Sequence, residues 1–356
     1  MSANTQEHGT QSASSAAALA RPSQMSTAQR LIRNVLASRE TAIVLVILAV
    51  IAVATSMNQS FLFSGQGWRD LLLTPSILIV MAVGSAIVII TRNVDLSVGS
   101  TLAITAYLTG RLFIDIPGIP VVAVVLIGIL VGAGLGLING ALVAFGKVPA
   151  LVVTLGTMYI YRGAVLTWAG SDRINASDMP REFLRLGTYQ VATIPLLTIV
   201  AVVVLLAAAY WLASTRSGRE MYAIGSNPEA ATLYGLPTTK RVITAFVVGG
   251  ALAGLAGVMY AARYGTVSSG AGMGWELQAI GAAVIGGIAI FGGSGTVWGA
   301  AFGAILLMTI NRTLPIIGIP DFWQRAVVGA LIIGAIVLDR YLAARQSRKL
   351  QEARQR

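Results

Sequence analysis

Long, almost uninterrupted apolar segments constrain the fold of this chain more than any other feature of its sequence. A hydrocarbon core about 30 Å thick is crossed by roughly 20 helical residues, because each residue advances an α-helix by about 1.5 Å. Segments of that kind occur at about 41–57, 71–91, 98–112, 120–145, 149–168, 193–213, 242–262, 276–292, 295–311 and 323–342. The sequence therefore predicts an all-α polytopic membrane protein with about ten transmembrane helices.

Composition agrees with a membrane protein and removes the residues that most enzymes use. Charged residues make up 11% of the chain, whereas soluble domains carry about 25%. The chain has no cysteine, and its one histidine, His8, lies in a polar N-terminal segment. Thiol nucleophiles, Ser–His pairs and histidine-based metal sites therefore lack their key residues. We expect no covalent chemistry, and no metal or cofactor bound by this chain.

The distribution of Lys and Arg indicates how the segments are oriented. Cytoplasmic loops of membrane proteins collect these cations. With the N-terminus inside, the inner segments hold about twice as many cations as the outer ones, which predicts that both termini are cytoplasmic. The net charge of +11 then reflects membrane topology rather than binding to nucleic acid. We expect a disordered tail at 1–28, a transmembrane domain at 29–345 and a basic tail at 346–356.

Two strips of glycine predict an internal repeat. At four-residue spacing, the fourth expected span carries Gly132, Gly136 and Gly140, and the ninth carries Gly295, Gly299 and Gly303. Such strips let helices pack closely, which is also the simpler explanation for them. The two spans are five helices apart, an odd number, so equivalent halves would enter the membrane in opposite senses. This predicts an inverted 5+5 repeat with halves at about 41–168 and 193–342, as is common in transporters.

The longest expected inner loop, 214–241, contains the signals of a very short helix. Asn227 can cap its N-terminus, and Pro228 suits the first helical position. Gly235 can end the helix, because glycine readily adopts the left-handed conformation found there. A helix of two turns is not stable alone, so we expect it to lie against another surface. The alternative is an ordinary capped helix in a loop.

Polar residues inside or between the spans are candidates for a solute path or gate. The segment from Thr91 to Ser100 is either a cytoplasmic turn, in which Arg92 and Asp95 pair, or a break at membrane depth. For side chains within the spans, hydrogen bonding between helices or snorkelling to the interface is the alternative. The candidates are Arg92, Asn93, Asp95, Ser97, Asn139, Tyr161 and Arg162.

The chain has no evident means of using energy by itself. The phosphate-binding pattern Gly-x-x-x-x-Gly-Lys-Ser/Thr does not occur in it. The expected spans also offer almost no Asp, Glu or His for an ion or proton relay. These absences favour a motor on a separate chain, and an ion-coupled secondary sugar transporter is the alternative.

Four segments in order resemble the permease subunits of ribose-type ATP-binding-cassette (ABC) importers. They are 91–100, 139–157, 229–235 and 279–295. Within this family, 91–95 and 161–168 look most similar to permeases for autoinducer-2, rhamnose or ribose. The resemblance implies a transport subunit, not an enzyme, with the type II fold of the vitamin B12 permease. Its solute would be a monosaccharide or a sugar-like molecule.

The resemblance also implies partners and a site. The partners are a second permease copy or homologue, a cytoplasmic ATPase that uses ATP and Mg, and a periplasmic sugar-binding protein, assembled on a bacterial inner membrane. The short helix in the inner loop would be the coupling helix that contacts the ATPase. By resemblance, the residues at that contact are Glu229, Ala230, Ala231, Leu233, Tyr234 and Gly235.

Overall fold

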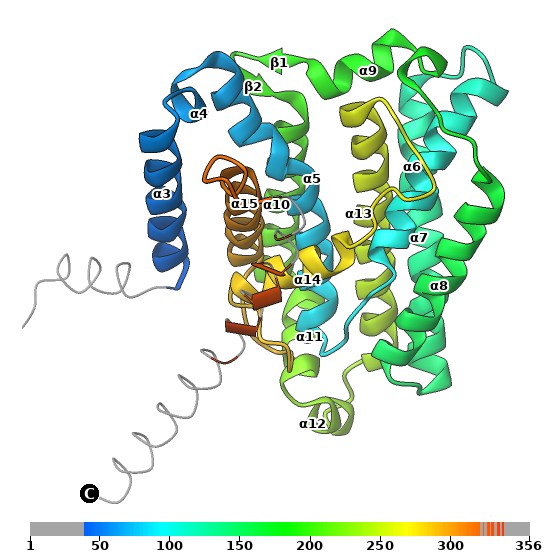
Figure 1. Ribbon diagram of the computed structural model, residues 1–356. Coiled ribbons are helices and arrows are strands. Elements are labelled where there is room, and N and C mark those ends of the chain that lie inside the picture. Colours follow the sequence, from blue (N-terminus) through cyan, green and yellow to red (C-terminus); the bar gives the residue numbers. More distant parts are fainter. Residues whose placement is uncertain are drawn as a thin grey trace, which may run out of the picture.

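The computed structural model describes residues 39–320 and the single residues 323, 326, 327, 329, 330, 333, 334 and 337. In this part of the chain, α-helices form a bundle with one small β-hairpin (Figure 1). The first elements are α3 (Arg39–Met57), α4 (Ser60–Phe63), α5 (Gly65–Ile90), α6 (Val98–Asp115), α7 (Val121–Gly146) and α8 (Ala150–Ala169). The next are η1 (Ala176–Asp178), α9 (Arg181–Thr188), β1 (Gln190–Val191), β2 (Ile194–Pro195) and α10 (Leu196–Ser214). The last are α11 (Arg216–Ser226), α12 (Pro228–Leu233), α13 (Thr238–Tyr264), α14 (Trp275–Ile285) and α15 (Val297–Thr313).

The helices have the length and composition of a polytopic membrane protein. Within the described residues, six are long and apolar enough to cross a membrane, namely α3, α5, α7, α8, α10 and α13. Two further expected spans are also helical, but α6 carries Arg111 and Asp115, and α15 has 17 residues. The last expected span, 323–342, lies largely outside the described residues.

Helix α14 is shorter than the span expected at 276–292. It ends at Ile285, and turns follow to residue 296. Gly292 and Gly293 have φ angles of 79° and 74° there, which an α-helix cannot accommodate. Gly295 has a φ of 113° in the same segment, so the expected strip of three glycines on the ninth span is wrong. Of these three glycines, only Gly299 and Gly303 lie on α15. We call residues 286–296, between α14 and α15, the glycine turn.

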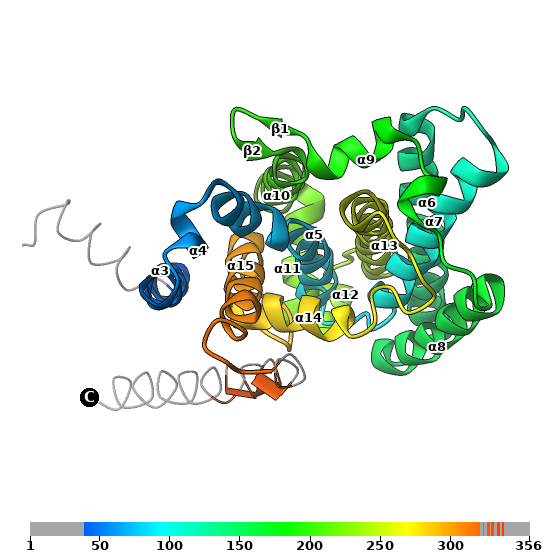
Figure 2. The same ribbon diagram turned by 45° about the horizontal axis from the view of Figure 1, so that its top comes forward.

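The core of the bundle forms around α5, which the other helices surround. Figure 2 shows α5 between α10, α13, α14 and α15, and each of these helices contacts it. Nearly every residue of its second half is buried, from Ser76 to Ile90. Other helices cover this half of α5, whereas the equally apolar α3, α7 and α10 are mostly uncovered in the structure. The position of α5 is therefore held from several sides.

Glycines set the closest helix contacts. A Cβ atom on Gly132 or Gly136 of α7 would collide with the α13 backbone, at Gly250 and Phe246 respectively. Gly140 also faces α13, where its Cβ would lie 3.0 Å from Ile243 Cα. On α15, Gly299 and Gly303 face the backbone of Gly286 and Ala282 in the same way. The five glycines that lie on these helices thus let two helix pairs pack backbone to backbone.

The two ends of the bundle carry different elements. Helix α9 and the β1–β2 hairpin lie at one end, and α11 and α12 lie at the other (Figure 1). The loop 214–241 is therefore on the side opposite the connection between α8 and α10.

Candidate functional site

The short helix expected in the inner loop is present as α12. The side chain of Asn227 accepts a hydrogen bond from Ala230 N at 3.0 Å, and Pro228 occupies the first turn. Gly235 has a φ of 72°, and Leu236 N donates to Ala231 O at 3.0 Å beyond the end of the helix. Asn227 and Gly235 thus begin and end the helix as the sequence predicts, because both signals act on residues close to them in the chain.

Helix α12 presents apolar side chains away from the bundle. The side chains of Leu233 and Tyr234 are 88% and 86% exposed, and Glu229 is exposed beside them. Ala231, expected to contact a partner, instead faces the bundle and is 4% exposed. It lies on the opposite side of the helix from Leu233, since residues two apart point in nearly opposite directions. Ala230 is half-buried.

An ion cluster that the sequence analysis does not anticipate holds α11 against α13. The carboxylate of Glu220 accepts hydrogen bonds from Arg241 Nε at 2.6 Å and from Arg216 Nε at 2.7 Å. These bonds, that from Arg241 first, lower the pKa of Glu220. The four-residue spacing of Arg216 and Glu220 is a recognisable helical pair. Arg241 carried no such signal, because it comes from a different helix.

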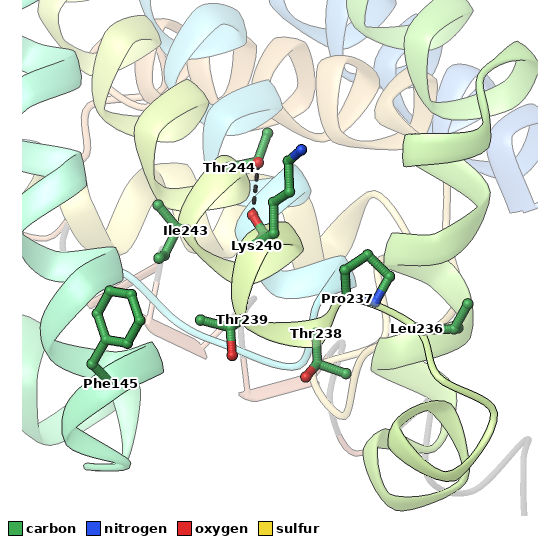
Figure 3. Close-up of a pocket in the computed structure, with 8 residues that line it drawn as sticks. All are labelled: Phe145, Leu236, Pro237, Thr238, Thr239, Lys240, Ile243 and Thr244. Carbon is green, nitrogen blue, oxygen red and sulfur yellow. Dashed lines mark hydrogen bonds between the residues drawn. The ribbon is translucent and has the colours of Figure 1, made fainter.

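A hollow of about 510 Å³ lies beside α12, between the end of α7 and the start of α13 (Figure 3). Its lining comes from both helices and from the segment that follows Gly235. The lining residues are Phe145, Leu236, Pro237, Thr238, Thr239, Lys240, Ile243 and Thr244. The first lining residue after α12 is Leu236, two residues beyond Tyr234.

The segment between α5 and α6 is a break between two helices that starts near the α12 end of the bundle and runs inward. Ser97 accepts a hydrogen bond from Asn139 Nδ2 at 2.8 Å, and Thr154 Oγ1 donates to Val94 O at 3.1 Å. Asn139 lies seven residues before the end of α7, which is about 10 Å along the helix axis. Ser97 therefore lies inside the bundle, as expected for a break, whereas Arg92 and Asn93 lie near Lys147 at the end of α7, as expected for a turn.

Four of the candidate path residues form one hydrogen-bonded cluster. The carboxylate of Asp95 accepts from Ser97 N at 2.8 Å and from Ser97 Oγ at 2.7 Å, rather than pairing with Arg92. The Ser97 hydroxyl is in turn bonded to Asn139, and the Tyr161 hydroxyl lies 3.4 Å from Asn139 Oδ1. The cluster ties the break to α7 and α8, which only the folded chain brings beside it.

The remaining candidates lie elsewhere. Arg92, with a φ of 65°, and Asn93 line a hollow of about 490 Å³ together with Lys147 at the end of α7. Arg162 donates from Nη1 to Ser269 O at 3.2 Å and to Ala271 O at 2.8 Å. It therefore joins α8 to the loop before α14, instead of extending to an interface. Among the described residues, no group of three or more His, Cys, Asp or Glu side chains is placed to hold a metal ion.

Comparison with known proteins identifies the relatives of this chain. Residues 69–336 match the family model described as the permease component of branched-chain amino acid transport systems. The autoinducer 2 import system permease protein LsrC of Enterobacter sp. (strain 638) is 35% identical over 325 residues, covering 90% of this chain and 93% of the relative. Its counterpart in Yersinia pseudotuberculosis serotype O:1b (strain IP 31758) is 34% identical over 315 residues, 88% of each chain. No solved structure matches.

Proposed function

Because the chain belongs to the permease family of branched-chain amino acid transport systems and is therefore a membrane permease, we propose that it serves an ABC importer for a sugar-like solute of the autoinducer-2 class. The relatives named for autoinducer 2 import span almost its whole length, which supports that solute class over other sugars. In this role the chain is a transport subunit and carries out no covalent chemistry itself.

The observation that carries the coupling part of the proposal is the exposed tip of α12. Leu233 and Tyr234 place two large apolar side chains in water at the end of a helix that is capped and anchored. Large apolar side chains that are exposed together are typical of a surface that binds another protein. The partner proposed here is a cytoplasmic ATPase, which would supply the ATP and Mg chemistry for which this chain has no phosphate-binding pattern.

The rest of the assembly follows from the same proposal. A second permease copy or a homologue would complete the path, and a periplasmic binding protein would deliver the solute at the end that carries α9. Both termini would be cytoplasmic, with ten spans in an inverted repeat of the type II fold. The support for this orientation is the cation distribution of the whole sequence, in which the expected inner segments hold about twice as many Lys and Arg as the outer ones.

The break between α5 and α6 is the proposed gate. It places Asp95, Ser97 and Asn139 in one polar cluster inside an otherwise apolar bundle. Irregular backbone at membrane depth is tolerated where it is buried in protein or lines a cavity, and in transporters it marks solute sites.

Replacement of both Leu233 and Tyr234 by alanine tests the coupling role. We expect at least tenfold less ATPase to co-purify with the permease, and uptake of labelled autoinducer-2 to fall with it, because truncation of central apolar anchors typically costs about 2 kcal/mol or more. The matched control is Tyr210→Ala, which removes a tyrosine that is 70% exposed on α10. Unchanged co-purification would refute the role of α12.

Uptake measurements in cells that contain the permease test both the solute and the energy source. Uptake of autoinducer-2 should exceed that of ribose and rhamnose, and it should stop when the ATPase is deleted. Uptake that persists without the ATPase and collapses with the proton gradient would instead indicate an ion-coupled transporter.

A further inference from the structure

The C-terminal end of α11 meets the end of α5 without any side chain between them. A Cβ atom on Gly225 would collide with the carbonyl oxygen of Ile90, the last residue of α5, and would lie 2.6 Å from Gly293 N. Gly293 N itself donates to the same Ile90 carbonyl at 3.0 Å. Three segments that are far apart in the sequence therefore touch at one carbonyl group.

The glycine turn extends this contact in both directions. A Cβ atom on Gly292 would lie 2.8 Å from Arg92 Cα, and one on Gly293 would lie 2.5 Å from Ser226 Cα. On one side the turn thus abuts the end of α11, and on the other it abuts the first residues of the polar break. Apart from the Cβ atoms of Arg92 and Ser226, which do not move by side-chain rotation, the nearest atoms in both contacts belong to the backbone.

A hydrogen bond joins α11 to the same turn. The hydroxyl of Tyr222, one helical turn before the end of α11, donates to Gly295 O at 2.9 Å. The tyrosine is half-buried, so water competes little for this bond. Tyr222 therefore holds the turn against α11 by a side chain, beside the backbone contacts at Gly225.

Helix α12 is joined to α11 directly. Asn227 is the only residue between the two helices, because it is both the C-cap of α11 and the N-cap of α12. A displacement of α12 consequently reaches α11 without a flexible linker between them. At the opposite end of α11, Glu220 binds Arg241 and keeps the helix close to α13.

We propose that Gly225, Gly292 and Gly293 form a rigid joint, held closed by Tyr222, that carries movement of α12 into the polar break at 91–97. The proposal rests on the proposed function, in which an ATPase moves α12. Contacts between backbones transmit small displacements, because no rotatable side chain lies between them to absorb the movement. From Ile90 the chain enters the break, where Asp95 and Ser97 connect it to Asn139 of α7. Tyr222 is a positioning residue in this scheme and does not contact the solute.

The variant Tyr222→Phe tests the joint, because it removes one hydrogen bond and keeps the ring. In the assembled transporter we expect normal ATPase co-purification and ATP hydrolysis, with uptake reduced about three- to tenfold, the range expected for one lost hydrogen bond. The solute taken up per ATP hydrolysed should therefore fall. The control Tyr210→Phe, at an exposed tyrosine of α10, should leave this ratio unchanged.

A second measurement follows the break itself. The natural chain has no cysteine, so Asn93→Cys introduces a single thiol into the segment. Its rate of modification by a thiol reagent should depend on ATP in the assembled transporter, and Tyr222→Phe or Gly225→Ala should weaken that dependence.

The outcomes separate the joint from the function on which it rests. If the parent permease fails to bind the ATPase, the proposed function fails. If it binds, and Tyr222→Phe leaves both the uptake ratio and the ATP dependence of labelling unchanged, the joint is refuted. A parallel loss of hydrolysis and uptake would also refute it, because it would show damage to the motor contact rather than to transmission.

Discussion

Glycine has two different uses in this protein, one in the α7–α13 contact and one in the glycine turn. Gly132 and Gly136 are helical, and they matter because a side chain there would push α7 away from α13. Gly292 and Gly293 have positive φ angles, and they turn the backbone beyond the end of α14 while packing against α11 and the end of α5. The first pair therefore determines how closely two helices pack, and the second pair determines where the backbone turns.

The largest effect is expected where a side chain would separate two helices. Gly136→Leu places a large side chain against Phe246 O and Gly250 of α13, and it should lower the free energy of unfolding by about 3 kcal/mol or more, because overpacked contacts force the backbone to move. Thermal unfolding in detergent measures this loss. The control is Gly134→Leu on the same helix, where nothing lies within 4 Å of the added Cβ. Equal losses in both variants would show that the α13 contact does not govern this strip.

Gly293→Ala should have a smaller effect on stability than Gly136→Leu and a large effect on transport. A positive φ costs an L-residue about 1–2 kcal/mol, and the added methyl group would also meet the backbone of Ser226. Gly118→Ala, between α6 and α7, is the matched variant, since its φ of 85° is similar but nothing lies within 4 Å of its Cβ. We expect both proteins to fold, with uptake lost more strongly at position 293. Equal uptake in the two variants would contradict a packing role for the glycine turn.

The ion cluster on α11 predicts a pH dependence. Hydrogen bonds from Arg241 and Arg216 lower the pKa of Glu220. The stability they provide is fully present above the pKa of an unfolded glutamate, about 4.3, and is lost as the pH falls through the lower folded pKa. Glu220→Gln should therefore lower the melting temperature at pH 7, and the difference from the parent should shrink below about pH 4. The control Glu182→Gln, at an exposed position on α9, should show no such convergence.

The smallest expected effect has the opposite sign. Gly134→Ala adds a methyl group where the structure leaves space, and alanine is the better helix former by about 0.5–1 kcal/mol. The variant should be slightly more stable than the parent in detergent, as measured by thermal unfolding. A clear loss of stability would indicate that this side of α7 packs against another subunit.

Local features of the fold and site could be predicted from the sequence. The boundaries of α12 follow from Asn227, Pro228 and Gly235, each of which acts within one or two turns. The expectation of a permease is confirmed by the family match and by the relatives named as permeases. The apolar segments likewise predicted helices at nearly every expected place, although α14 ends early.

Other features could not be predicted, for identifiable reasons. The apolar composition of the glycine turn predicts parts of two spans, 276–292 and 295–311. Hydropathy contains no information about backbone φ angles, so it cannot reveal the turn. Ala231 was placed with the external contacts, since a helix of six residues has no periodic pattern to reveal its inner face. Tyr222 and Arg241 were missed altogether.

What the sequence by itself determined is local: which segments are apolar enough for lipid, where α12 is capped and stopped, and that the phosphate-binding pattern is missing. Tertiary structure alone decided that Gly225 touches Ile90, that Tyr222 reaches Gly295 and that Asn139 reaches Ser97. The physical reason is distance along the chain. A cap or a hydropathic run stabilises residues next to it, whereas these contacts join segments that become neighbours only when the helices pack.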